Sequence, residues 1–196
     1  AAKKNQKNFK IFVSNISENI IKLIFPTFFV VLFSLKDVVP FVFGEKWIIS
    51  GTFCTYMCVW FYFKIIYNSL DNTVNLKKKI KEDFYLKLFF LILKSCALLL
   101  GVYLGDVFLT VILFVSASTI SIVVNVIWIH YISKVKFSKI FKTIFSNILI
   151  SFLFSIPILL SYIFKIEGVF KFMIYLISFL SFIFFIYINI IKKTKN

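Results

Sequence analysis

Long apolar stretches alternate with short polar connectors along most of the chain. Six stretches reach or approach the ~20 residues that a helix needs to cross a bilayer, namely residues 22–44, 47–69, 88–104, 107–131, 144–163 and 172–191. We interpret them as helices rather than strands, because an isolated segment in lipid must satisfy its backbone hydrogen bonds internally. The pattern therefore predicts an all-α membrane protein with about six transmembrane helices.

Two short segments flank these spans. Residues 1–21 are rich in lysine and form a juxtamembrane segment that leads into the first span, and residues 192–196 form a short basic tail. The chain begins with Ala1 and contains no methionine near that end, so we expect it to be part of a longer protein.

Composition agrees with a membrane setting. Hydrophobic residues make up 61% of the chain, compared with about 45–50% in soluble domains. A chain of 196 residues cannot hide that much apolar surface in a core of its own, because a domain of this size still leaves about 30% of its unfolded surface exposed. Lipid is the solvent that this composition favours.

The net charge of +15 comes entirely from lysines, whose placement is uneven. Seventeen lysines lie in residues 1–22, 70–87, 132–143 and 192–196, whereas the intervening connectors hold only Lys46, Lys165 and Lys171. The positive-inside rule then places both ends of the chain in the cytoplasm. The charge is thereby explained by topology, and we expect no nucleic-acid partner, because no soluble domain is present to carry a basic patch.

Ionisable groups inside the predicted spans are costly and are often functional. Lys94 lies in the middle of its span, and Ala97 and Gly101 follow on its face at helical spacing, so we expect it to point into the protein. Lys64 lies nearer the end of its span, within reach of the cytoplasmic interface by snorkelling.

Lys36 and Asp37 form a further candidate site because they precede Pro40. A proline has no N–H and its ring crowds the carbonyl of the residue four positions earlier, which predicts a helix break at Lys36. A charge at a broken helix is typical of transporter sites. The alternative is that both charges lie near the outer interface beside a packing kink.

Other polar residues indicate contacts between helices rather than catalysis. Two spans carry polar faces that serve either helix packing or substrate contact, formed by Ser118, Ser121 and Asn125 and by Asn147, Ser151 and Ser155. His130 ends a span beside Trp128 and Tyr131, as an interfacial residue would. Cys54 and Cys58 lack further ligands nearby, so we expect no metal. The sequence also has no phosphate-binding loop, nucleophile elbow or carboxylate pair, so we expect no cofactor and no enzyme activity.

A short outward hairpin gives the chain its one family resemblance. Phe43-Gly44-Glu45-Lys46-Trp47, followed by Gly51, is a tight turn in which Gly44 ends one helix and Trp47 anchors the next at the interface. This motif and the order of the spans over residues 20–165 resemble the C-terminal half of bacterial oligosaccharide flippases, in the multidrug/oligosaccharidyl-lipid/polysaccharide exporter superfamily. A proline that often follows the second span in that family is missing, and we expect the last span, 172–191, to exceed the family's usual helix count.

The resemblance implies one lobe of a two-lobed transporter in the bacterial inner membrane. Its partners would be the N-terminal lobe of the same protein, membrane lipids and an undecaprenyl-pyrophosphate-linked oligosaccharide, which it would flip between leaflets. Lys94, Lys36 and Lys64 would bind the pyrophosphate, and Asp37 would bind a coupling ion. The alternatives are a drug or ion antiporter of the same superfamily, a membrane glycosyltransferase or polymerase, and an accessory membrane subunit.

Overall fold

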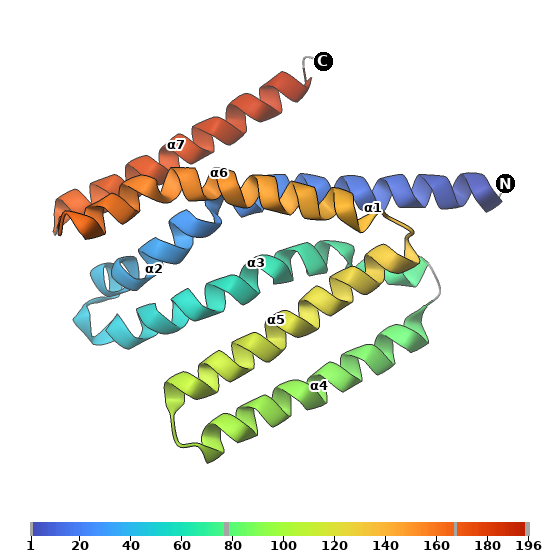
Figure 1. Cartoon of the computed structure of the whole chain (residues 1–196), viewed down its shortest axis with the longest axis horizontal. Coiled ribbons are helices and arrows are strands. Elements are labelled where there is room, and N and C mark those ends of the chain that lie inside the picture. The colour runs from blue at the N-terminus through green and yellow to red at the C-terminus, as the bar shows by residue number, and fades with distance from the viewer. Residues whose placement is uncertain (1, 77–78, 167, 195–196) are drawn as a thin grey trace. The chain divides into compact units, whose positions relative to one another are not determined.

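The computed structural model describes residues 2–76, 79–166 and 168–194, with the side chains of 2–5, 75–76, 137 and 186–194 outside the description. Every regular element in these ranges is helical (Figure 1). The elements are α1 (Ala2–Ile24), η1 (Phe25–Thr27), α2 (Phe28–Phe43), η2 (Glu45–Trp47), α3 (Ile48–Leu76), α4 (Ile80–Tyr103), α5 (Val107–Ile132), α6 (Phe137–Ile163) and α7 (Val169–Thr194). The lysine pair at 77–78 and residues 195–196 of the predicted tail lie outside the described residues.

Five helical segments of the described chain are long and apolar enough to span a membrane, and α7 contributes a shorter apolar stretch, Val169–Phe185. The prediction of an all-α membrane protein with about six such helices is confirmed. Two helices extend beyond the apolar spans predicted from hydropathy, because their additional turns carry charged or polar residues. Helix α4 begins at Ile80, well before the predicted 88–104, because its first two turns are charged. Helix α3 continues to Leu76, beyond the predicted 47–69.

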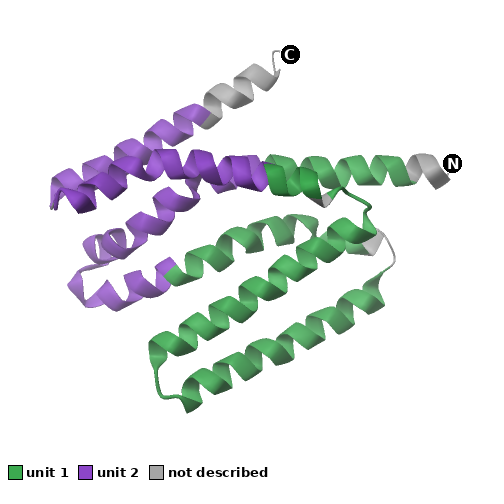
Figure 2. Cartoon of the chain, viewed as in Figure 1, with its two compact units in different colours: residues 1–20, 56–142 green, residues 21–55, 143–196 purple. Residues whose placement is uncertain are grey.

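The chain divides into two compact units, each described here by itself (Figure 2). The first unit comprises residues 1–20 and 56–142, and the second comprises residues 21–55 and 143–196. Three of the long helices, α1, α3 and α6, contribute one part to each unit.

Helices α4 and α5 form an antiparallel hairpin in the first unit and pack along each other (Figure 1). Gly101 of α4 faces Thr110 of α5 so closely that a Cβ atom on the glycine would lie 2.5 Å from the Thr110 Cα. Asp106 caps the start of α5, because its carboxylate accepts hydrogen bonds from the backbone N–H groups of Phe108 (2.8 Å) and Leu109 (3.2 Å). The glycine and the cap together bring the two helices close along their antiparallel course.

The first part of α1 is held to the end of α5 within the same unit. His130 Nε2 lies 2.9 Å from the Ser17 hydroxyl, and its Nδ1 lies 2.7 Å from the Val126 carbonyl. His130 is only 1% exposed, so it is covered by protein as well as lying at the end of its helix. The helix that covers it comes from a segment 113 residues earlier, which local sequence around His130 does not reveal.

The second unit has a core of aromatic and aliphatic side chains contributed by α2, α6 and α7. Val30, Ile158 and Tyr175 are buried at its centre, and Phe33, Phe154 and Phe172 are among the side chains packed around them. Such a core holds the three helices together by close packing.

One residue of the predicted polar face in α6 does connect two helices. The Ser151 hydroxyl accepts a hydrogen bond of 2.8 Å from the backbone N–H of Phe29, in the first turn of α2. That N–H has no partner within its own helix. Asn147 and Ser155 instead bond to carbonyls of their own helix, so Ser151 alone among the three makes a hydrogen bond between helices.

The hairpin between α2 and α3 has the predicted tight turn. Gly44 has a φ of 96° and donates its N–H to the Pro40 carbonyl at 2.8 Å, which ends α2 at a residue without a Cβ. Helix α2 nevertheless runs through Pro40 without interruption, so the predicted helix break is wrong, whereas the predicted loss of a hydrogen bond to the Lys36 carbonyl follows from the missing proline N–H. One missing hydrogen bond does not open the helix here, because α3 packs against this point: a Cβ on Gly51 would lie 3.1 Å from the Lys36 carbonyl and 3.3 Å from the Pro40 ring.

Candidate functional site

Lys94 lies on the packed side of α4. The residues of this helix that are buried or half-buried recur at helical spacing, and they include Phe90, Lys94, Ala97 and Gly101. Leu91, Ile92 and Leu99, on the other side, are each more than half exposed. In a membrane helix such apolar side chains face lipid, so the Lys94 side chain emerges from the face that meets the rest of the unit.

Lys64 of α3 lies close enough to Lys94 for their like charges to act on one another. Because α3 continues to Leu76, Lys64 lies twelve residues before the helix end, which is about 18 Å at 1.5 Å per residue. Its ammonium group lies 5.3 Å from the centre of the Trp60 ring, a cation–π distance. Neither Lys64 nor Lys94 has a carboxylate partner within 4 Å among the described residues.

Unpaired polar atoms accompany this pair of lysines. The indole Nε1 of Trp60 is buried without a hydrogen-bond partner, and so is the hydroxyl of Ser118 on α5. Gly101 of α4 lies beside Thr110 of α5, and the two helices run antiparallel. Two turns back along α4 from Gly101 lead to Lys94, and two turns forward along α5 from Thr110 lead to Ser118, so these two residues lie at the same level. Buried polar groups normally have partners, so the Trp60 indole N–H and the Ser118 hydroxyl leave hydrogen-bonding capacity unused in the same unit as the two lysines.

Lys36 differs from these two lysines. It belongs to the second unit, its side chain is exposed, and no hydrogen bond or ion pair to it is present in the described part of the chain. Its backbone carbonyl, rather than its ammonium group, makes the close contact, with Gly51 of α3. The structure therefore does not bring its charge together with a second group in the second unit.

Asp37 is the most heavily coordinated charge in the second unit. One carboxylate oxygen, Oδ2, accepts hydrogen bonds from the hydroxyls of Tyr162, at the end of α6, and of Tyr175, on α7 at 2.5 Å. Lys171, in the first turn of α7, forms an ion pair with the same oxygen at 2.9 Å and lies 4.2 Å from the centre of the Tyr162 ring. Asp37 thus connects three helices through a single oxygen.

The sequence pattern identified Asp37 but none of these partners. They lie 125 to 138 residues away, in a helix end and a connector that read as ordinary interfacial sequence. Two signals were present: Lys171 is one of only three lysines in the outward connectors, and tyrosine is typical of membrane interfaces. The arrangement is that of a structural ion pair with two additional hydrogen bonds, because a lysine and two hydroxyl donors already balance the aspartate charge.

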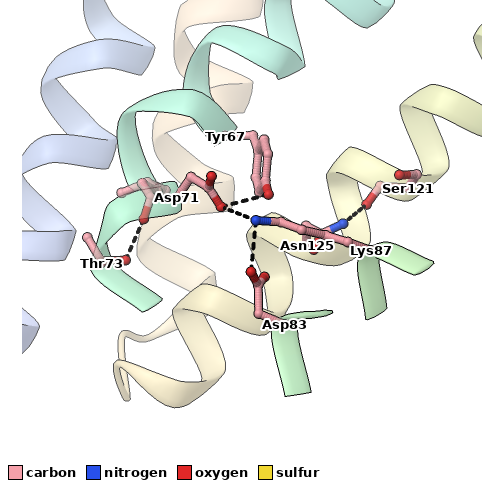
Figure 3. A network of polar contacts seen from close by, with 8 residues as sticks. Tyr67, Asp71, Thr73, Asp83, Lys87, Ser121 and Asn125 are labelled. Carbon is pink, nitrogen blue, oxygen red and sulfur yellow. Dashed lines mark hydrogen bonds and ion pairs between the residues drawn. The ribbon is translucent and has the colours of Figure 1, made fainter. Parts of the chain in front are cut away.

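A second charged network lies where α3 ends and α4 begins, within the first unit (Figure 3). Lys87 forms ion pairs with Asp71 at 2.9 Å and with Asp83 at 2.8 Å. The Tyr67 hydroxyl donates to Asp71 at 2.7 Å. Lys87 and Asp71 remain substantially exposed, at 44% and 37% of their side-chain surfaces, so this network ties two helix ends together at a wet surface, where each pair contributes little.

No family model, curated protein or solved structure matches this chain. The functional argument therefore rests on the chain's own residues: a donor-rich pair of lysines in the first unit, a satisfied aspartate in the second, and helices suited to a membrane.

Proposed function

We propose that this chain is one lobe of a bacterial flippase that moves undecaprenyl-pyrophosphate-linked oligosaccharide across the inner membrane for surface polysaccharide synthesis. One observation carries the proposal: Lys94 lies on the packed face of an apolar helix, and neither Lys94 nor Lys64 has an acidic partner among the described residues. Two such cations are stable together when an anion balances them, and a pyrophosphate supplies that charge.

Electrostatics gives the size of the effect. A lysine and a phosphate charge 4 Å apart attract by about 4 kcal/mol at an effective dielectric constant of 20, before desolvation is subtracted. The indole N–H of Trp60 and the hydroxyl of Ser118, both buried and unpaired, are donors of the kind that phosphate oxygens accept. The polyprenyl tail needs no site, because it remains in the bilayer while the head crosses.

The remaining parts of the proposal come from the resemblance of the hairpin and the order of the spans. A second lobe, N-terminal to this one, would complete a central cavity that opens alternately to either side. Lysine placement supports an orientation with both ends in the cytoplasm, and Lys36 would meet the substrate only at an outer opening.

The antiporter alternative needs an intramembrane carboxylate that is available to a coupling ion. Asp37 is the candidate, but its Oδ2 atom already has an ion pair with Lys171 and hydroxyl donors from Tyr162 and Tyr175. Binding of a cation at this oxygen would have to displace Lys171. This geometry favours a structural role for Asp37 over ion coupling. The antiporter then lacks its carboxylate, whereas the flippase proposal rests on the lysines and assigns the coupling ion to no residue.

Complementation of a strain whose surface polysaccharide depends on the full-length gene tests the proposal. We expect Lys94→Ala to reduce surface polysaccharide at least tenfold with protein level and membrane insertion unchanged, and Lys94→Arg to retain part of the activity because the charge remains. Lys142→Ala is the matched control, since Lys142 is exposed on α6 and has no partner among the described residues. Full activity of Lys94→Ala would refute a role for the charge.

The same assay separates the other classes. A polymerase would leave single repeat units on the cell surface when it is inactive, whereas an inactive flippase leaves lipid-linked units at the cytoplasmic face. An accessory subunit would tolerate Lys94→Ala. The flippase proposal predicts that undecaprenyl-linked repeat units accumulate at the cytoplasmic face of the membrane in cells that carry Lys94→Ala.

A further inference from the structure

A basic pocket of about 270 Å³ lies in the first unit between α1 and the turn that joins α5 to α6. Its lining includes Lys10, Ile11, Ser14, Asn15, Lys136 and Lys139. These residues belong to neither the Lys64–Lys94 pair nor the Asp37 cluster, so the proposed function leaves them unexplained.

Local structure fixes the two walls of the pocket. On one side, Lys134 adopts a φ of 56° directly after α5, and Val135 donates its N–H to the His130 carbonyl at 3.0 Å, which turns the chain sharply before α6. On the other side, α1 is held by the contact of Ser17 with His130 and by an ion pair of 2.5 Å between Glu18 and Lys139. The pocket is therefore built by fixed elements.

The pocket carries a positive charge that the protein itself does not balance. Glu18 pairs with Lys139 and accepts a hydrogen bond of 2.7 Å from Ser14, which accounts for one of the three lysines. Lys10 and Lys136 have no carboxylate within 4 Å among the described residues. Two ammonium groups and the amide of Asn15 thus offer donors to an anion in the pocket.

Apolar side chains beside the pocket indicate which kind of anion binds there. Ile11, which lines the pocket, is 48% exposed, and Phe12 next to it is 51% exposed. An amphipathic helix with this arrangement lies in the membrane interface, with its apolar residues among acyl chains and its lysines at the phosphates. The pocket volume of about 270 Å³ is just below the roughly 300–1,000 Å³ of pockets for drug-sized ligands, which suits a headgroup rather than a whole lipid.

We propose that this pocket binds the phosphodiester headgroup of an anionic phospholipid, with Lys10 and Lys136 on the phosphate and the acyl chains over Ile11 and Phe12. The bound lipid holds α1 in the interface beside the α5–α6 turn. This inference does not depend on the proposed transport function, since it uses none of the residues assigned to the substrate.

Lysine labelling of the whole chain in nanodiscs tests the site without any mutation. The protein is placed in phosphatidylcholine alone or in phosphatidylcholine with phosphatidylglycerol, and acetylation of each lysine is followed by mass spectrometry. We expect phosphatidylglycerol to slow acetylation of Lys10 and Lys136 at least fivefold. Lys22 and Lys81 are exposed and belong to the lysine-rich segments of the sequence, so they report the general effect of a charged membrane surface. Their acetylation rates should change less than twofold.

Matched double variants then measure the affinity for phosphatidylglycerol by native mass spectrometry. Each interfacial lysine contributes about fivefold, so Lys10→Gln with Lys136→Gln should weaken binding about 25-fold, whereas Lys22→Gln with Lys81→Gln should leave it within threefold. Equal slowing of acetylation at all four monitored lysines would overturn the proposal. Equal protection by 10 mM inorganic phosphate would overturn the lipid assignment, because a free anion would then suffice.

Discussion

Replacing Asp37 by asparagine removes the charge that connects α2, α6 and α7 while keeping the size of the side chain. The variant retains an oxygen that can accept from Tyr162 and Tyr175, but Lys171 loses its counter-ion. Lys171 and Asp37 expose only 17% and 23% of their side chains, so water replaces the lost interaction incompletely. We therefore expect the variant to be less stable in its second unit.

The magnitude follows from the environment of the pair. Hydrogen bonds to a charged group contribute about 1.5–3 kcal/mol each, and an asparagine oxygen retains part of each one. The ion pair lies between the surface case, at about 0–1 kcal/mol, and the buried case, where loss of one partner costs about 3–5 kcal/mol. Together these bounds predict that Asp37→Asn lowers the free energy of unfolding by about 2–4 kcal/mol. About 1–2 kcal/mol of this decrease is the coupling energy between Asp37 and Lys171.

A double-mutant cycle measures this coupling directly. Unfolding by sodium dodecyl sulfate in mixed micelles is followed by circular dichroism for the wild type, Asp37→Asn, Lys171→Gln and the double variant. Glu45→Gln is the matched control, because Glu45 is an exposed acid in the same unit with no ion-pair partner among the described residues. Additive effects of Asp37→Asn and Lys171→Gln, or a loss no larger than that of the control, would refute the reasoning.

Two further predictions concern packing in the first unit. Gly101→Ala should lower stability by about 1–3 kcal/mol through overpacking, because the new Cβ would lie 2.5 Å from the Thr110 backbone; detergent unfolding checks this, and Ser95→Ala on the exposed side of α4 should be neutral within about 0.5 kcal/mol. His130→Ala should release α1, since it removes the buried partner of Ser17; faster hydrogen exchange over residues 6–20 is the expected result, and unchanged exchange there would contradict the contact.

The helices could be predicted because a long apolar stretch indicates a segment that is surrounded by lipid. The helix ends were harder to predict, since α4 begins with charged turns that hydropathy alone assigns to a loop. Pro40 shows the limit of a local rule: the missing hydrogen bond at Lys36 is real, but Gly51 lets α3 pack against that point, and α2 stays continuous. A rule that considers one helix at a time cannot include its neighbour.

Long-range partners were the part that one sequence could not supply. Asp37 and Lys94 were identifiable as charges in apolar surroundings, but Tyr162, Tyr175 and Lys171 meet Asp37 only through the packing of helices far apart in the chain. The same holds for the approach of Lys64 to Lys94. Periodicity predicts which face a residue occupies, and it carries no information on which distant helix covers that face.

The affinity of the protein for undecaprenyl pyrophosphate tests the central claim most directly. Binding is measured by native mass spectrometry in nanodiscs for the wild type, for Lys64→Gln with Lys94→Gln, and for Lys22→Gln with Lys142→Gln, which removes two exposed lysines instead. We predict that the Lys64 and Lys94 double variant binds at least tenfold more weakly while the control double variant binds like the wild type. Equal affinities for all three proteins would contradict the claim that these two lysines recognise a pyrophosphate.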